Sequence, residues 1–426
     1  MKMSYVGKLS IFFGISWGLE GLDRLIVGYT APGYMPDLKL NFTQLGFLFS
    51  IAGICTAIGA WVINPLTEYY GRKIGSVWVN LVNTVISGIT GLVRSFGQML
   101  GIRALVALGF GGMYGPGLAA VSEESPPEKR GFYMGLTQSF WPFIGMGLGP
   151  IVVGYLLESV GWRAAFFLIM IPGVICILYM ASFMREPASV AENIKVRKET
   201  GKRVLLHEGK EVHLLDVFKY RNVIVSTIIA VFTMAYLWVL FGFAPSLFGQ
   251  VHKFSPILTG WVMCGGGFLT CAMQILGPHL SDLIGRKPIL IIMFALGTVG
   301  GILFAMSPPG TSPGLLAFYF ALFCIGLSSY PLYLVIIPTE SVPFTIAATA
   351  VAVPQGLGEI IGATVFPTLG GRIADTYGLT YTVWVVVICS IVALLSCFFL
   401  KESAPRILAK RGLAPVSGRA LSPSPM

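Results

Sequence analysis

The sequence predicts an all-α integral membrane protein with twelve transmembrane helices arranged as two six-helix repeats. Its composition is the first indication, since 55% of the 426 residues are hydrophobic and 11% are charged, whereas soluble domains carry about 25% charged residues. The second is that the apolar residues gather in stretches of about 20 residues or more, the length that a helix needs to cross a bilayer. The third is an internal repeat of sequence motifs.

Twelve apolar stretches follow one another along the chain. The spans predicted from them are 10–33, 43–66, 74–94, 97–121, 131–157, 162–184, 222–246, 256–280, 288–306, 313–337, 343–370 and 378–400. The first is too long for the apolar region of a signal peptide and contains Glu20, Asp23 and Arg24, so we expect it to be a span that stays in the protein.

Basic residues concentrate in alternate connections between the spans. Arg72 with Lys73 and Arg286 with Lys287 lie in two of them, and the segment 185–221 holds nine Lys or Arg beside six acids. This pattern predicts a multi-pass protein of the plasma (inner) membrane with both termini in the cytoplasm. The net charge of +10 therefore reflects the orientation of the chain in the membrane, and we expect no nucleic-acid partner. The long basic segment could also contact anionic lipid.

The polar segment 185–221 divides the spans six and six. We expect a short amphipathic helix around 212–220 and a tail rich in Gly, Pro, Ser and basic residues that is disordered. The predicted domains are an N-terminal half, a cytoplasmic linker, a C-terminal half and the disordered cytoplasmic tail, at 1–190, 191–216, 217–405 and 406–426.

The two halves repeat one another. The segment from Glu68 to Lys73 matches the segment from Asp282 to Lys287 at a distance of 214 positions. Further matches lie 217 positions apart, pairing Gly109, Glu123, Pro126, Gln138, Gly145, Pro150, Gly154, Glu158 and Gly161 with Gly326, Glu340, Pro343, Gln355, Gly362, Pro367, Gly371, Asp375 and Gly378. Parallel repeats imply a substrate site between the halves near mid-membrane, reached alternately from each side as the halves rock.

The turn from Asn64 to Lys73 resembles the loop motif Gly-x-Leu-x-Asp-Arg-x-Gly-Arg-Arg of the major facilitator superfamily. Asn64, Glu68 and Tyr69 depart from that motif. The resemblance extends over residues 1–405 and implies that these charged residues form a conformational latch. The other interpretation is that they only set the topology of the chain in the membrane. The predicted latch residues are Glu68, Arg72, Lys73, Asp282, Arg286 and Lys287.

Within that superfamily the chain is most similar to the aromatic acid:proton symporters. The first span reads from Leu19 to Pro32 much like their Asp-Gly-x-Asp element, with Glu20 replacing the first Asp, and Arg103 to Gly112 resembles their Arg-x-x-x-Gly-x-Gly-x-Gly-Gly apart from Ala107. The pair Asp23-Arg24 also resembles the first helix of the organic anion:cation symporters, which are the second candidate family. Those proteins carry an acid at the position where Phe110 stands here.

Another segment is similar to a motif of drug:proton antiporters. Gly145, Gly149, Pro150 and Gly154 follow its Gly-Pro pattern. Close helix packing is the interpretation we favour for it, because small residues let membrane helices approach one another.

Five ionisable residues lie inside the predicted spans: Glu20, Asp23, Arg24, Arg103 and Glu359. Charges within a membrane are costly and indicate a polar pathway. The first three share one helix face, and burial and a nearby Arg act in opposite directions on a carboxyl group. We predict Asp23 as the proton carrier, with Glu20 and Glu359 as further proton sites; fixed bridges from Arg24 to Glu20 or Glu359 are the alternatives.

Arg103 could bind a substrate carboxylate in bidentate fashion, or serve as the counter-ion of Asp23. The two roles are compatible, because protonation of Asp23 would release Arg103 for an anion and so couple the two ligands. Aromatic residues in the spans could stack on an aromatic substrate or simply pack. The predicted substrate-binding residues are Arg24, Arg103, Gln138, Trp141, Tyr236, Tyr330 and Gln355.

These residues predict a secondary active transporter that works by alternating access. It carries a small organic carboxylate, with aromatic acids among the candidates, together with a proton. The five intramembrane charges sum to −1 when all are ionised, so one proton neutralises them. A proton-coupled antiporter that exports hydrophobic or cationic compounds is the alternative. We expect no enzyme activity, no metal and no cofactor apart from the coupling proton; the partners are a small organic anion and the bilayer, and the chain acts as a monomer.

Overall fold

The computed structural model describes residues 4–126, 130–186, 214–342, 346–410 and 412, and within these ranges it contains helices and no strand. The first half comprises α1 (Tyr5–Tyr29), α2 (Ala31–Leu38), α3 (Phe42–Tyr70), α4 (Arg72–Ile89), η1 (Thr90–Leu92), α5 (Phe96–Glu124), α6 (Arg130–Phe140), η3 (Trp141–Leu148), α7 (Gly149–Ser159) and α8 (Trp162–Phe183).

The second half begins with the 3₁₀ turn η4 (Leu214–Lys219), where an amphipathic helix was expected. It continues with α10 (Arg221–Gln250), α11 (Pro256–Ile284), α12 (Arg286–Ala305), α13 (Pro313–Cys324), η5 (Leu327–Ser329), η6 (Leu332–Ile336), α14 (Ile337–Glu340), α15 (Ala347–Leu357), η8 (Gly358–Gly362), α16 (Ala363–Tyr377), α17 (Thr380–Cys397) and α18 (Pro405–Lys410). Most of the predicted linker 191–216 lies outside the described residues, and α18 stands at the start of the predicted tail.

Ten helical segments among the described residues are long and apolar enough to cross a membrane. Two more complete the set of twelve: α1, which carries the charged cluster, and α5, whose apolar stretch runs over Phe96–Gly112. The predicted all-α fold of twelve transmembrane helices in two repeats is confirmed. Proline and π-helical turns interrupt several spans, so that α6, η3 and α7 together form the fifth.

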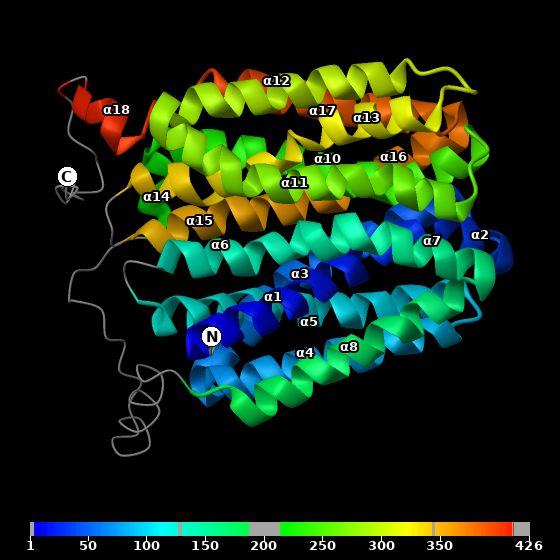
Figure 1. The fold of residues 1–426 in the computed structure, drawn as a ribbon, viewed down its shortest axis with the longest axis horizontal. Helices are drawn as coiled ribbons and strands as arrows, with labels where there is room; N and C mark the ends of the chain where they lie inside the picture. The colour runs from blue at the N-terminus through cyan, green and yellow to red at the C-terminus, as the bar shows by residue number, and fades with distance from the viewer. Residues whose placement is uncertain (1–3, 127–129, 187–213, 343–345, 411, 413–426) are drawn as a thin grey trace.

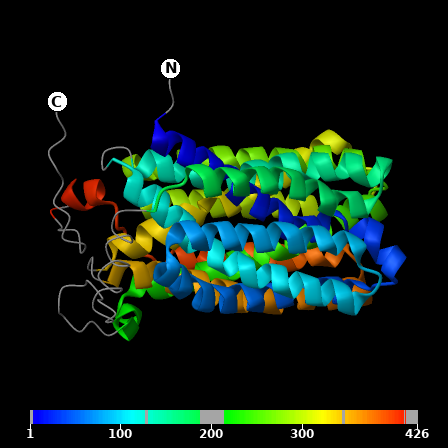
Figure 2. The same ribbon diagram turned by 90° about the horizontal axis from the view of Figure 1, so that it is seen from below.

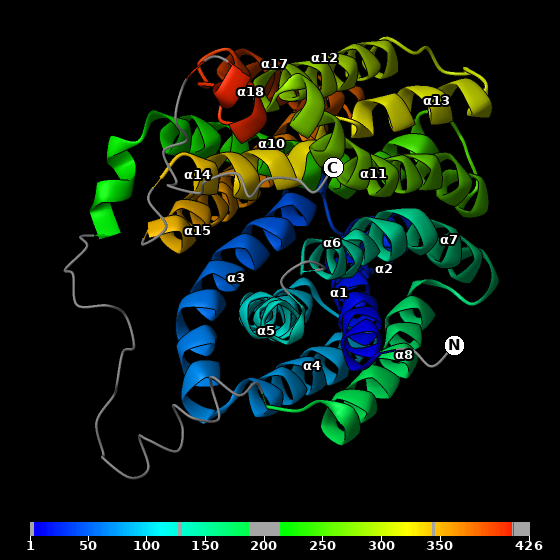
Figure 3. The same ribbon diagram turned by 60° about the vertical axis from the view of Figure 1, so that its left-hand side comes forward.

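The two halves lie side by side with their helices roughly along one axis (Figures 1 and 2). The start of α1 and the helix α18 lie at one end, which we call the terminal end, while α2 and the end of α7 lie at the opposite, loop end. Figure 3 shows α3 and α6 of the first half next to α15 and α11 of the second. The interface between the halves therefore runs along the length of the molecule.

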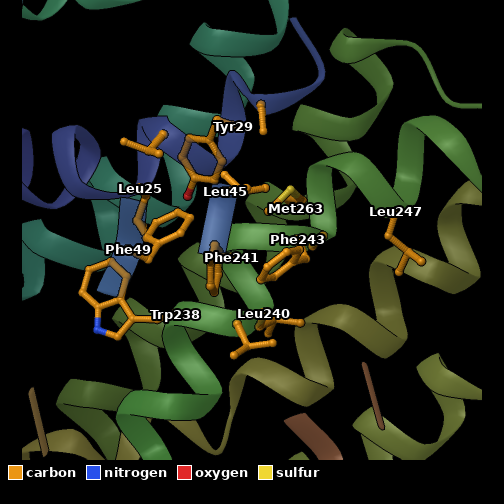
Figure 4. Close-up of a cluster of buried hydrophobic side chains, with 14 of the residues drawn as sticks. Leu25, Tyr29, Leu45, Phe49, Trp238, Leu240, Phe241, Phe243, Leu247 and Met263 are labelled. Carbon is orange, nitrogen blue, oxygen red and sulfur yellow. The ribbon is translucent and has the colours of Figure 1, made fainter. Parts of the chain in front are cut away.

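At the loop end the halves are closed against each other. Ser50 of α3 hydrogen-bonds Thr364 O and the Thr368 hydroxyl of α16, and the Asp375 carboxylate accepts hydrogen bonds from the Phe42 and Thr43 amides at 2.9 and 2.8 Å. A buried apolar cluster continues this contact, with side chains of α1, α3, α10 and α11 packed together (Figure 4).

Glycines bring the backbones together at this end. A side chain at Gly46 would collide with Pro367 O, and one at Gly260 with Pro150 O. Gly154 packs in the same way, since an added Cβ would lie 2.5 Å from Pro256 O. The Gly-Pro pattern around Pro150 therefore serves helix packing in this conformation, as small residues do in membrane bundles.

The repeat is visible in how each half begins its third span. Gly71 and Gly285 precede α4 and α12 with φ of 112° and 121°, values that favour glycine. Glu186 accepts a hydrogen bond from the Lys73 amide at 2.9 Å, and Glu402 accepts one from the Arg286 amide at 2.8 Å. An acid thus lies at the N-terminus of each helix, where the helix dipole stabilises negative charge.

Candidate functional site

A central cavity of about 710 Å³ lies between the halves. Both halves contribute to its walls, so it occupies the place that the repeat predicts. Its lining residues are Trp17, Arg24, Gln138, Trp141, Pro142, Met146, Thr233, Met234, Leu237, Trp238, Thr270, Gln274, Leu327, Tyr330, Tyr333, Gln355 and Glu359. The lining combines aromatic rings, amides and charged groups, a mixture typical of sites for small organic molecules.

Arg24 is the cation of this cavity. Its guanidinium donates to both oxygens of Glu359 at 3.3 Å and lies 3.6 Å from Glu20 Oε1, one helical turn away. The guanidinium also stacks over the Trp238 ring, with 4.6 Å from Cζ to the ring centroid. Arg24 therefore links α1 of the first half to η8 of the second.

Of the three described π-helical segments that contribute to the cavity wall, η3, η6 and η8, the first and the last lie in equivalent spans. They begin at Trp141 in η3 and at Gly358 in η8, positions 217 residues apart in equivalent spans. A π-helical turn widens the helix and re-aims its side chains, which is why such turns are frequent at functional sites. Here they direct Trp141 and Glu359 into the cavity.

Glu20 is held by the first of these segments. The Trp141 indole donates to Glu20 Oε2 at 2.7 Å. The indole lies against Gly21, where an added Cβ would lie 2.9 Å from it, so glycine makes the contact possible. Glu20 consequently shares its two oxygens between Trp141 and Arg24.

Asp23 and Arg103 form a second, deeper pair within the first half. Arg103 Nη1 donates to Asp23 Oδ1 at 2.9 Å and Nη2 to the Asp23 carbonyl at 2.7 Å, and the Ser87 hydroxyl donates to the same carboxylate. Both residues are buried, each with 3% of its surface exposed. Phe110 lines both the cavity beside Asp23 and the cavity that Arg103 shares with Arg24, and its ring lies 5.8 Å from the Arg24 guanidinium carbon.

The structure brings together most of the predicted substrate-binding side chains. Gln138, Trp141, Tyr330 and Gln355 line the central cavity with Arg24, and the Tyr330 hydroxyl donates to Gln355 Oε1 at 2.9 Å. Arg103 instead lines an adjoining cavity of about 310 Å³ with Arg24, Phe110 and Trp238.

Tyr236 lies apart from the cavity. Its side chain is fully buried within the second half, and its hydroxyl donates to the Phe323 carbonyl. Sequence reasoning had also missed Gln274, a cavity-lining amide on α11. An uncharged polar residue in an apolar span is the signal that would have pointed to it.

The predicted latch is described for the second half. Arg286 pairs with Asp282 at 2.6 Å and with Glu340 at 2.8 Å, and Lys287 Nζ donates to Phe398 O at 2.6 Å. The side chains of Glu68 and Arg72 lie outside the described residues, and the Lys73 amide contacts Glu186. These contacts all join elements of the same half.

No group of three or more His, Cys, Asp or Glu side chains suited to a metal ion occurs among the described residues. The absence of a cofactor remains a prediction from the sequence.

Comparison with known proteins identifies relatives of the whole chain. Residues 13–358 match the Major Facilitator Superfamily family model. The chain is 27% identical to the probable 4-methylmuconolactone transporter of Cupriavidus pinatubonensis, over 82% of this chain and 79% of that protein. It is 24% identical to the cis,cis-muconate transport protein of Acinetobacter baylyi, over 94% and 95%. A solved D-xylose-proton symporter has a similar fold, with a TM-score of 0.73 and 19% identity over 94% of this chain and 99% of that one.

Proposed function

The chain belongs to the major facilitator superfamily, and we propose that it carries a small organic carboxylate across the plasma membrane in symport with a proton. The observation that carries this proposal is Arg24, a buried cation that faces the central cavity while two acids share it. Relatives named for muconate and methylmuconolactone transport support a carboxylate as the substrate class.

The charges of the site account for coupling. Glu20, Asp23 and Glu359 oppose Arg24 and Arg103, which sums to −1. A monoanionic substrate that arrives with one proton leaves this sum unchanged, so the loaded and empty carriers carry the same charge through the membrane. A substrate without the proton would add an uncompensated buried charge, which is costly.

In this mechanism the substrate carboxylate binds Arg24 and takes the place of one of its two acids. The proton resides on Asp23, where it weakens the pair with Arg103 and leaves that guanidinium free to turn toward the adjoining cavity beside Arg24. Stacking between Trp238, Trp141 and Tyr330 would accommodate an aromatic or conjugated substrate. Each ligand then favours the binding of the other.

With both termini in the cytoplasm, as the basic connections predict, the closed loop end faces the outside. The conformation would then be one in which the site is shut to the exterior. The latch residues at the terminal end, led by Arg286 with Asp282 and Glu340, would help select between conformations.

Uptake into proteoliposomes tests the proposal. An inward proton gradient should drive accumulation of labelled aromatic or aliphatic carboxylates in the parent protein. Asp23→Asn should abolish the accumulation while substrate exchange, which needs no net proton movement, continues. The matched control is Asp37→Asn, because Asp37 is an acid exposed on α2. This variant should transport as the parent does.

The alternative is a proton-coupled exporter of hydrophobic or cationic compounds, which the aromatic lining and the net negative charge of the cluster would also suit. Gradient-dependent movement of a lipophilic cation, with no movement of any acid, would favour that function and make Glu20, Asp23 and Glu359 cation ligands.

A further inference from the structure

One face of α4 is polar although it lies inside the first half. Its residues follow one another at helical spacing and are between 1% and 9% exposed; they are Ser76, Asn80, Asn83, Thr84 and Ser87. We call these five residues the α4 strip. It starts one turn into α4, at the terminal end, and reaches Asp23 at Ser87, a distance of about 16 Å at 1.5 Å per residue.

Hydrogen bonds hold both ends of the α4 strip. Asn80 donates to the Ser76 carbonyl at 2.8 Å and accepts from the Ser16 hydroxyl of α1, while Ser87 donates to the Asp23 carboxylate. Between these contacts lies a second cavity of about 340 Å³, whose walls include Ser16, Glu20, Asp23 and the strip from Asn80 to Ser87. It is separate from the central cavity.

Asn83 lies in the middle of the α4 strip and lines this cavity. Both polar atoms of its side chain are buried without a hydrogen-bond partner among the described residues. Such atoms are costly to bury unless water satisfies them. These polar groups form part of the cavity wall, and the cavity has room for water.

The neighbouring helices leave room for this face. A side chain at Gly109 of α5 would collide with the Asn83 amide, and one at Gly173 of α8 would lie 2.6 Å from Thr84. Glycine at both positions is thus what allows the polar side chains to project into the cavity.

The other half provides a comparison within the same molecule. The residues 214 positions after the α4 strip, at the corresponding places of α12, are Leu290, Phe294, Gly297, Thr298 and Gly301. Four of the five are apolar or glycine, and Leu290 and Phe294 are fully buried. The fold packs this span with Thr298 as the one polar residue among the five, so packing does not account for the α4 strip.

We propose that the cavity along the α4 strip holds a chain of water that carries protons between the terminal end and Asp23, apart from the substrate's route. During inward transport the protonated Asp23 carboxyl passes its proton to the nearest water, and the chain delivers it as a hydronium ion to the terminal end, which leaves Asp23 as a carboxylate. Arg103 is the charged partner with which this carboxylate pairs again, and Glu20 and Arg24 are the other charged groups nearby. The inference rests on the proposed proton coupling.

Blocking the middle of the chain tests it. Asn83→Leu fills the site with an apolar side chain, and it should reduce gradient-driven accumulation at least tenfold while substrate exchange stays within twofold of the parent. Thr298→Val in the corresponding span of the other half is the matched control and should leave both unchanged. Full accumulation in Asn83→Leu would overturn the proton route. Failure of the parent to accumulate substrate would instead refute the proposed coupling.

Water access gives a second, independent readout. A cysteine placed at Asn80 or Asn83 should react with a small water-soluble thiol reagent added from the terminal side, while Phe294→Cys should not, with the parent as blank. No reaction at either position would overturn the proposal even if Asn83→Leu did not fold. Accumulation driven by a sodium gradient at constant pH would also overturn it, since the oxygens around Asp23 would then bind a cation.

Discussion

At the scale of single residues, Arg24 is the centre of the site. It is the cavity-facing cation on α1, it bridges to Glu359 of the other half, and it stacks on Trp238. A planar guanidinium can do all three at once, because its donors lie in the plane and its face is free for an aromatic ring. The ammonium group of a lysine cannot reproduce this geometry.

Arg24→Lys should therefore weaken substrate binding at least about tenfold, which corresponds to about 1.4 kcal/mol, even though the charge is kept. Binding of the transported acid to purified protein, followed by calorimetry or by quenching of tryptophan fluorescence, measures this. Arg163→Lys is the control, because Arg163 stacks on Trp162 at 4.1 Å at the loop end, far from the cavity. Equal affinities in Arg24→Lys and the parent would remove Arg24 from the binding site.

Residue roles could be predicted from the sequence only in part. Glu20, Asp23 and Arg24 stood out because three charges within five residues of an apolar span are costly. The partner of Arg24 could not be identified, since Glu359 lies 335 positions away and is brought near only by the packing of the halves. Tyr236 looked like the other aromatic candidates, but its hydroxyl bonds to Phe323 O, a contact set by helix rotation.

At the scale of helices, the predicted latch around Arg286 contains one ion pair with a partly buried acid and one with an exposed acid. The Arg286 side chain is 7% exposed; its partner Glu340 is 17% exposed, whereas Asp282 is 58% exposed. Removing the better-buried acid leaves a buried guanidinium poorly paired, which costs more than losing a solvated pair.

Glu340→Gln should therefore lower the free energy of unfolding by about 1–3 kcal/mol, against about 0–1 kcal/mol for Asp282→Asn. Thermal melting of the two variants and the parent in the same detergent gives the order of stabilities. A lower melting temperature for Asp282→Asn than for Glu340→Gln would contradict the assigned roles of these pairs.

Glycine contacts at the loop end give a second prediction for the helices. Gly46→Val would push α3 away from Pro367 of α16, and so it should disfavour the conformation closed at that end. Transport should fall, and a cysteine at Ser50 should become reactive to reagents added from the loop side. Gly97→Val on α5, where nothing lies within 4 Å of an added Cβ, should change neither; unaltered labelling in Gly46→Val would contradict the closure.

At the scale of the whole molecule, two similar halves enclose an asymmetric site. The spans and their division into six and six could be read from hydropathy and motif repeats, and most predicted ends agree with the helices within a few residues. The closed loop end could not be predicted, because it depends on backbone contacts between α3 and α16 and between α7 and α11. Charge lies mainly in the first half, which provides four of the five intramembrane ionisable residues.

This asymmetry assigns different tasks to the halves. The first half holds the acids and arginines together with the α4 strip, while the second adds Glu359, Trp238 and the amides of Gln274 and Gln355 to the cavity. Rocking between halves would then change the distance between Arg24 and Glu359, an ion pair that joins the two halves across the cavity.

The size of the accumulation at equilibrium tests the central claim most directly. If one proton moves with each monoanion, transport is electroneutral, and the substrate concentration ratio across proteoliposomes should rise about tenfold for each unit of pH difference, whatever the membrane potential. Imposing a series of pH differences and measuring the internal labelled acid gives this slope. A ratio that stays near one at every pH difference, or that follows the membrane potential alone, would contradict one-to-one proton symport.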